Sequence, residues 1–319
     1  MHMGDSSAGG EADAAGAGEM STNPVMSDDS GALEQATLDL ATLGIVNEPR
    51  RARRPDESLQ AKSGHGPARV IALCNQKGGV GKTTSTINLG AALAECDQRV
   101  LLVDFDPQGA LSVGLGVNAY DLELTVYNLL MQSGIRTEDV LVKTNVTGLD
   151  LLPSNIDLSA AEVQLVSEVA REQTLDRALR QVRDEYDYIL IDCQPSLGLL
   201  TVNALTAAHG VIVPLECEFF SLRGLAMLID TIEKVKDRLN PDLELDGILA
   251  TMYDSRTVHS RQVLSRVVEA FGDKVYDTVI SRTVRFPETT VAGEPITTWA
   301  PGSGGAKAYR ALAREVLAR

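Results

Sequence analysis

The stretch NQKGGVGKTTS (residues 75–85) decides the fold of this chain. It contains two lysines, Lys77 and Lys82, with only glycine and valine between them. The usual phosphate-binding loop, GxxxxGK[ST], would place its first glycine at position 76, where this sequence has Gln76. The remaining KGGVGKTT follows an apolar run and precedes a helical pattern, so we expect its backbone N–H groups to cradle phosphates at a helix N-terminus.

The loop residues predict a nucleotide site with a magnesium ion. The glycines allow the backbone to come close to phosphate oxygens, Lys82 reaches the β- and γ-phosphates, and the Thr83 hydroxyl binds Mg²⁺. We therefore expect a nucleoside triphosphate and Mg²⁺ at this loop. The loop residues expected to bind the nucleotide, which the resemblance described below implies is ATP, are Gly78, Gly79, Val80, Gly81, Lys82, Thr83 and Thr84.

Apolar runs alternate with amphipathic stretches from Arg69 to the C-terminus. This alternation predicts an α/β fold, a doubly wound, mainly parallel sheet flanked by helices. The expected strands are 69–75, 99–106, 186–196, 210–216 and 245–254, and the expected helices are 82–97, 162–184, 222–239 and 260–271.

The motif KGGVGKTT resembles the deviant Walker A motif of the ParA/MinD group of P-loop ATPases, and is most similar to that of ParA-type (Soj-like) chromosome-partitioning ATPases. The resemblance covers residues 69–319 and implies the P-loop NTPase fold of the deviant Walker A type. It continues through VDFDPQG (103–109), YDYILIDCQPSLGLLTVNAL (186–205), TMYDSRT (251–257) and TVRFPE (283–288).

The resemblance implies roles for several charged residues. Lys77 should reach across a nucleotide-sandwich dimer to the phosphates of the partner's ATP, where a second cation stabilises developing charge. Asp106 should position the attacking water, Asp104 should lie near the Mg²⁺ ion, and Asp192 matches the Walker B aspartate. The acids end predicted strands, where ligands of α/β sheets bind. The expected catalytic residues are Lys77, Lys82 and Asp106, and the expected metal-site residues are Thr83, Asp104 and Asp192.

Two positions depart from the family pattern, Ala110 where Asn is usual and Gln194 where Pro is frequent. Both flank switch regions, so they bear on the rate and timing of hydrolysis rather than on nucleotide binding. In the resembling family a loop near the C-terminus lines the adenine. The resemblance places that loop here around Pro287 and Glu288, which we expect to contribute to ATP binding.

The net charge of −15 is unevenly distributed along the chain. Residues 1–48 hold nine acidic residues and no Lys or Arg, whereas residues 254–285 hold six basic residues against four acidic ones. In the resembling family, arginines that match Arg256 and Arg285 bind double-stranded DNA non-specifically in the ATP-bound homodimer. Dimerisation doubles the phosphate contacts, so binding should require ATP and weaken with salt.

The resemblance also implies partners and a location. A ParB-like activator protein should stimulate an otherwise slow ATP hydrolysis and so release the dimer from DNA. We expect a cytoplasmic, nucleoid-associated protein with no membrane partner, because no apolar run is long enough to span a bilayer and no secretory signal is evident.

The chain divides near residue 67. Residues 1–66 form an acidic tail with few large apolar side chains, so we expect it to be disordered. Within it, residues 32–45 have helical spacing and residues 50–54 form a basic patch. We interpret 32–45 as a transient helix in a solvated linker, with docking on a partner as the alternative. Residues 67–319 form the ParA-like ATPase domain.

Three alternative functions stay open. A MinD-like membrane-associated ATPase would need a membrane-binding C-terminal helix, but the helix expected from about Gly305 has alanines where a membrane face needs bulk. A metabolic or iron–sulfur relative is disfavoured in its iron–sulfur form because the four cysteines form no CxxC pair. A ParA paralogue that serves condensin-type segregation proteins would use the tail for docking and a different activator.

Overall fold

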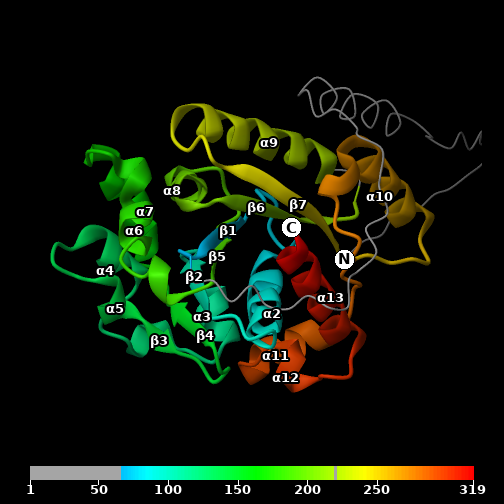
Figure 1. Ribbon diagram of the computed structural model, residues 1–319, viewed down its shortest axis with the longest axis horizontal. Helices are drawn as coiled ribbons and strands as arrows, with labels where there is room; N and C mark the ends of the chain where they lie inside the picture. Colours follow the sequence, from blue (N-terminus) through cyan, green and yellow to red (C-terminus); the bar gives the residue numbers. More distant parts are fainter. Residues whose placement is uncertain (1–65, 219–220) are drawn as a thin grey trace, which may run out of the picture.

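A seven-stranded sheet forms the centre of the molecule in the computed structural model, which describes residues 66–218 and 221–319 (Figure 1). The strand order is β3-β4-β2-β5-β1-β6-β7, and neighbouring strands are parallel except for β3 with β4. The strands are β1 (Arg69–Leu73), β2 (Val100–Phe105), β3 (Val142–Lys143), β4 (Leu149–Leu152), β5 (Tyr188–Cys193), β6 (Gly210–Glu216) and β7 (Glu244–Thr251).

The parallel strands are buried on both faces, which explains their continuous apolar sequences. All residues of β2 and β6 are buried, as are all but the first of β1 and β5. The five strands expected from the sequence are therefore confirmed. Strands β3 and β4 were not expected, because two and four residues are too short to leave a clear pattern.

The 13-residue helix α2 begins at Lys82, within the phosphate-loop motif, and α10 to α13 follow the last strand, β7. The helices are α2 (Lys82–Ala94), α3 (Ala110–Gly114), α4 (Val126–Met131), α5 (Thr137–Val140), α6 (Leu158–Gln164), α7 (Thr174–Leu179), α8 (Leu199–Ala207), α9 (Ser221–Arg238), α10 (Val258–Phe271), α11 (Arg285–Ala292), α12 (Ile296–Trp299) and α13 (Gly304–Ala318).

Helices cover both faces of the sheet (Figure 1). One core lies between the sheet and α2, α3, α12 and α13, and the other between the sheet and α4 to α10. Alternate residues of β1 pack in the two cores: Ile71 belongs to the first core, and Val70 belongs to the second. The predicted doubly wound fold is confirmed.

The helix predicted over residues 162–184 is wrong. That stretch contains the end of α6, all of α7 and short 3-10 turns between and after them. Ala170 between the two helices has a left-handed backbone with φ 54°, which interrupts a regular helix.

The C-terminal helix α13 packs inside the domain. It buries Tyr309 and Leu312 against the core that contains α2, and the Tyr309 hydroxyl lies 3.1 Å from the hydroxyl of Ser85. This confirms the prediction of a core helix rather than a membrane-binding one. None of the helices within the described residues is long and apolar enough to cross a membrane.

The tail predicted for residues 1–66, including its helix at 32–45 and its basic patch at 50–54, lies outside the described residues except for Gly66. Its disorder stays a prediction. The order of the strands, with β1 between β5 and β6, brings the ends of these three strands to one edge of the sheet. Ligands of doubly wound folds bind at such an edge, next to the point where the strand order reverses.

Candidate functional site

The loop between β1 and α2 has the backbone of a phosphate cradle. Gly79 and Gly81 have left-handed conformations, with φ 74° and 85°, which side chains with a Cβ adopt only at a cost. Gly81 is also the N-cap of α2, so the loop leads directly into the positive end of a 13-residue helix.

Two side chains hold the loop to neighbouring strands. Asn75 donates from its amide to the Pro214 carbonyl oxygen at 2.8 Å and accepts from the Lys77 N–H at 3.0 Å. The Thr251 hydroxyl donates to the carbonyl oxygen of Val80 at 2.8 Å. These bonds tie the loop to β6 and β7, so the cradle is preorganised.

Lys82 lies at the phosphate loop and is buried. The side chain is in the first turn of α2, and the residue is only 6% exposed. Its ammonium donates to the carbonyl oxygen of Lys77 at 3.2 Å, across the mouth of the loop. A buried cation with one carbonyl partner has unused donors for phosphate oxygens.

Two carboxylates lie side by side at the ends of β2 and β5. Asp104 and Asp192 are paired in the sheet register, and both are fully buried. Burial raises the pKa of Asp192, and the neighbouring Asp104 raises it further. Its Oδ1 accepts a bond from the Thr86 hydroxyl at 3.4 Å, whereas its Oδ2 is buried without a partner among the described residues.

The unpaired oxygen of Asp192 fits a divalent cation. Mg²⁺ binds through one or two protein oxygens together with waters and substrate phosphates. The Thr83 hydroxyl lies close enough to Asp192 to oppose the rise in its pKa, so it supplies a second oxygen beside the phosphate loop. The structure therefore brings together two of the three predicted metal-site residues and places the third, Asp104, next to them.

Asp104 is held mainly by Ser112. The N–H and hydroxyl of Ser112 both donate to its Oδ2, at 2.8 and 2.6 Å. Burial raises the pKa of Asp104 to about 7, although these bonds oppose the shift. Asp106, two residues further on, is half-buried, and its carboxylate accepts from the N–H of Gln108 at 3.0 Å. Its predicted role in positioning water stays a prediction.

Lys77 points away from its own phosphate loop. Its ammonium lies 2.9 Å from Glu216 Oε2 and 2.8 Å from Glu218 Oε2, and its side chain is 36% exposed. Burial alone would lower the pKa of Lys77, but the hydrogen bonds to Glu218 and Glu216 outweigh it and raise the pKa. The second lysine of the motif is thus a fully charged group near the surface.

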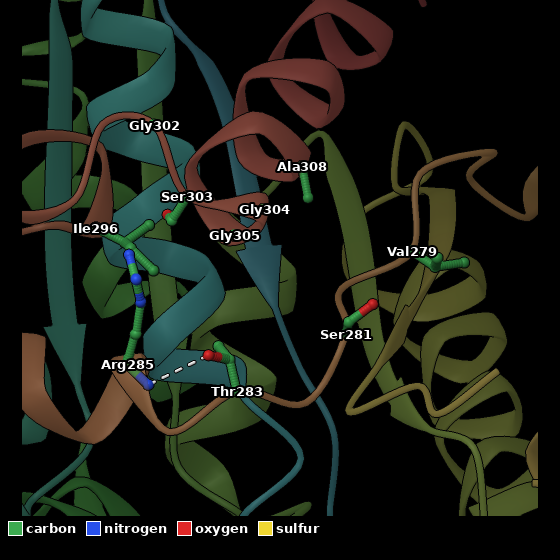
Figure 2. A pocket seen from close by; sticks show the side chains of 10 residues that line it. All are labelled: Val279, Ser281, Thr283, Arg285, Ile296, Gly302, Ser303, Gly304, Gly305 and Ala308. Atoms are coloured by element: carbon green, nitrogen blue, oxygen red, sulfur yellow. Dashed lines mark hydrogen bonds between the residues drawn. The ribbon is translucent and has the colours of Figure 1, made fainter. Parts of the chain in front are cut away.

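A cavity of about 420 Å³ lies between the start of α13 and the segment that carries Val279, Ser281 and Thr283 (Figure 2). Arg285 and Ile296 complete one wall. Its size and position near α2 suit a nucleoside. The exposed Pro287 and Glu288 are absent from its lining, so their predicted part in ATP binding stays a prediction.

The two predicted DNA-binding arginines lie on neighbouring surface segments. The Arg256 side chain is 88% exposed and forms an ion pair with Asp254, with 2.8 Å between Nη2 and Oδ2. Arg285 is the exposed first residue of α11. A short pairing between Tyr253 and Ser281 joins the two segments.

The two departures from the family pattern have different surroundings. Ala110 is the first residue of α3, next to Gly109, while Gln194 donates from its side chain to Glu162 of α6 at 3.0 Å. Cys193, beside Asp192, has its sulfur 2.8 Å from that of Cys74. Both thiols are buried, and burial raises the pKa of Cys193, which suits a packing role.

Sequence reasoning missed several residues of the site. Asn75, Thr251, Ser112 and the two partners of Lys77 were not expected. A signal existed only for Glu216 and Glu218, since the apolar run GVIVPLECE ends in two acids at the same sheet edge.

A glycine-rich cradle at a helix N-terminus, a buried lysine and a carboxylate with a free oxygen define a P-loop nucleotide-hydrolysing site. A family described as an AAA domain matches residues 68–245. Among curated proteins, an uncharacterized protein of Mycobacterium tuberculosis is 68% identical over 277 residues, 87% of this chain and 86% of that protein.

Two named relatives are also similar. Chromosome partitioning protein ParA of Caulobacter vibrioides is 51% identical over 79% of this chain and 95% of its own length. Sporulation initiation inhibitor protein Soj of Bacillus subtilis is 49% identical over 78% of this chain and 98% of its own length. The chain therefore belongs to the ParA/Soj family of P-loop ATPases, with ATP and Mg²⁺ as cofactors.

Solved structures of similar proteins include one with a bound nucleotide. A Mycobacterium smegmatis protein called cobyrinic acid a,c-diamide synthase, with bound ADP and magnesium, is 45% identical. It matches 77% of this chain and 92% of its own, with a TM-score of 0.68. The cell division ATPase MinD of Pyrococcus furiosus is 27% identical over 78% of this chain and 98% of its own, with a TM-score of 0.64.

Proposed function

We propose that this ATPase is a DNA-partitioning switch that closes as an ATP-bound dimer. The observation that carries the proposal is that the two lysines of the loop lie in different surroundings. Lys82 is buried at its own phosphate loop, whereas the charged Lys77 ammonium is near the surface and bonded to side chains at the end of β6. This difference supports a role for Lys77 at a nucleotide outside its own loop.

In the closed dimer each protomer contributes Lys77 to the other's ATP. Mg²⁺, held through Thr83 and Asp192, would neutralise phosphate charge when bound. Lys82 binds the phosphates of its own protomer's ATP, and Asp106 orients the attacking water. Lys77 in trans stabilises charge that develops on the transferring phosphoryl group, so catalysis depends on dimerisation.

DNA binding by the dimer uses Arg256 and Arg285. Their exposure and their position on adjoining segments support a shared role in contacting phosphates. Such contacts carry no sequence information, so binding is non-specific and falls steeply with salt. Two copies of each arginine give the dimer more contacts than the monomer.

Release requires hydrolysis, which is slow without a partner. The names of relatives at about half identity support a role in chromosome partitioning, and a ParB-like activator is the partner that the family resemblance implies. A nucleoid-associated location in the cytoplasm would follow from DNA binding. A condensin-associated paralogue with another activator is the nearest alternative. A MinD-like membrane switch is disfavoured because the apolar face of α13 is buried in the domain core.

The name of the Mycobacterium smegmatis relative suggests a second candidate, ATP-dependent amide formation. If glutamine supplied the nitrogen, a reactive nucleophile would be needed to release it. Cys74, Cys193 and Cys217 are buried, and burial raises the pKa of the half-buried Cys96. The partition proposal is therefore preferred for this chain.

The proposal is tested by binding to a non-specific DNA duplex with ATP, with ADP and without nucleotide, at two salt concentrations. Wild-type protein is compared with Lys77→Ala and Arg285→Glu. We expect binding that requires ATP, weakens with salt and is lost in both variants. Protein that binds ATP, but whose DNA affinity is the same with all nucleotides, would overturn the partition function.

A further inference from the structure

Glu216 connects two parts of the site that the proposed function uses separately. It is the last residue of β6, and its side chain is 11% exposed. Its two carboxylate oxygens bind different cations. Oε2 accepts from the Lys77 ammonium at 2.9 Å, and Oε1 accepts from the Arg282 guanidinium at 3.1 Å.

Arg282 in turn lies on the segment that leads to Arg285, which is paired with the segment of Arg256. Its N–H donates to the carbonyl oxygen of Tyr253 at 3.3 Å, and the Tyr253 N–H donates to Ile280 at 3.1 Å. This small ladder joins the loop of Arg256 to the loop that precedes Arg285. The position of both arginines therefore depends on how firmly the ladder is anchored.

The connection between the ladder and the sheet is strained. Met252, which links β7 to Tyr253, has a left-handed backbone with φ 49°, and an unbranched residue with a Cβ adopts this conformation at a cost. The Arg282 guanidinium lies 3.9 Å from the Met252 sulfur. A strained connection is kept in place by its surroundings, and here the surroundings include the ion pair of Arg282 with Glu216.

A nearly buried carboxylate is costly without charged partners. With Lys77 in its present position, Glu216 shares its charge between two cations. When Lys77 moves to the partner's ATP, Arg282 is the cation that remains bonded to Glu216 within the described residues. A hydrogen bond between charged groups strengthens as competition for the acceptor disappears.

We propose that Glu216 is a positioning residue that couples the location of Lys77 to DNA binding, a proposal that rests on the proposed function. When Lys77 leaves, the carboxylate of Glu216 interacts with Arg282 without competition from Lys77. The stronger ion pair holds the ladder more firmly and so positions Arg256 and Arg285 for phosphate contact. Because coupling is reciprocal, DNA binding also favours the dimer in which Lys77 is engaged in trans.

The test uses full-length protein and a non-specific DNA duplex, and its readout is the ratio of DNA affinities with ATP and with ADP. Glu216→Gln keeps the shape of the side chain but removes its charge. Glu218→Gln is the matched control, since Glu218 also binds Lys77 at 2.8 Å but has no hydrogen bond to Arg282 in the described part of the chain. Nucleotide affinity and dimer mass are measured alongside for every variant.

We expect Glu216→Gln to reduce the ATP-to-ADP ratio at least about fivefold, as loss of a typical coupling does, and Glu218→Gln to leave it within about twofold. Arg282→Gln, at a side chain that is 66% exposed, should fold normally and reproduce the loss. The double variant should then lose no more than either single one, because both act through one contact.

An unchanged ratio in Glu216→Gln and Arg282→Gln would overturn the coupling. Equal losses in Glu216→Gln and Glu218→Gln would also overturn it, because they would trace the effect to Lys77 alone. Wild-type protein with no nucleotide-dependent DNA binding would instead refute the proposed function, so the two failures are distinguishable.

Discussion

Substitution of Ser112 tests whether its hydrogen bonds hold Asp104 at the end of β2. Its hydroxyl donates to Asp104 at 2.6 Å and accepts from the N–H of Ser154 at 3.1 Å, and all three residues are buried. Ser112→Ala removes a bond to a charged acceptor and leaves a buried N–H without its partner. Together these losses should lower the free energy of unfolding by about 3 kcal/mol.

The assay is urea unfolding at pH 8, where Asp104, with its pKa of about 7, is mostly ionised. Ser221→Ala is the control, because the Ser221 hydroxyl is buried but has no hydrogen-bond partner among the described residues. Its removal should change stability by less than about 1 kcal/mol. At pH 5 the cost of Ser112→Ala should shrink, since the acceptor is then neutral. Equal effects of the two substitutions at pH 8 would show that Ser112 does not hold Asp104 in this way.

Further predictions concern pH, backbone and thiols. The folded pKa of Asp104, about 7, exceeds its ordinary 3.8, so metal-free protein should lose stability as pH rises from about 4 to 7, by up to about 1.4 kcal/mol per pH unit. Asp104→Asn should flatten this part of a pH series of unfolding curves, and an unchanged slope would contradict the assignment. Gly109→Ala should destabilise by at least about 2 kcal/mol, because φ is +63° and a Cβ would lie 2.7 Å from the Ser154 carbonyl oxygen. Gly134→Ala, with φ +88° and open space, should cost only about 1 kcal/mol when both variants are compared by thermal unfolding. An alkylating reagent should label Cys96 before the three buried cysteines, and mass spectrometry that finds another site first would contradict the packing described above.

Sequence alone predicted the features that local pattern controls. The phosphate loop, the parallel strands and the acids at Asp104 and Asp192 each leave a signature within about ten residues, because burial on both faces or a helix N-terminus requires particular neighbours. The core role of α13 was predictable for the same reason. Its small apolar stripe suits packing against the domain rather than insertion in a membrane.

The partners of the charged groups could not be predicted in this way. Lys77 and Glu216 are 139 residues apart, and their contact depends on β6 lying beside β1. Ser112 reaches Asp104 only because α3 folds back across the strand end. The break in the helix predicted over 162–184 likewise reflects tertiary packing, which overrides a periodic sequence pattern.

A mixing experiment with two inactive variants decides whether Lys77 acts in trans. Lys77→Ala retains its own ATP site and Asp106, whereas Asp106→Ala lacks the residue that positions water but still offers Lys77. Each variant alone should be inactive. Random pairing in an equal mixture makes half of the dimers mixed, each with one complete site, so ATPase activity should return to about a quarter of the wild-type value. A mixture that stays as inactive as the separate variants would contradict the account.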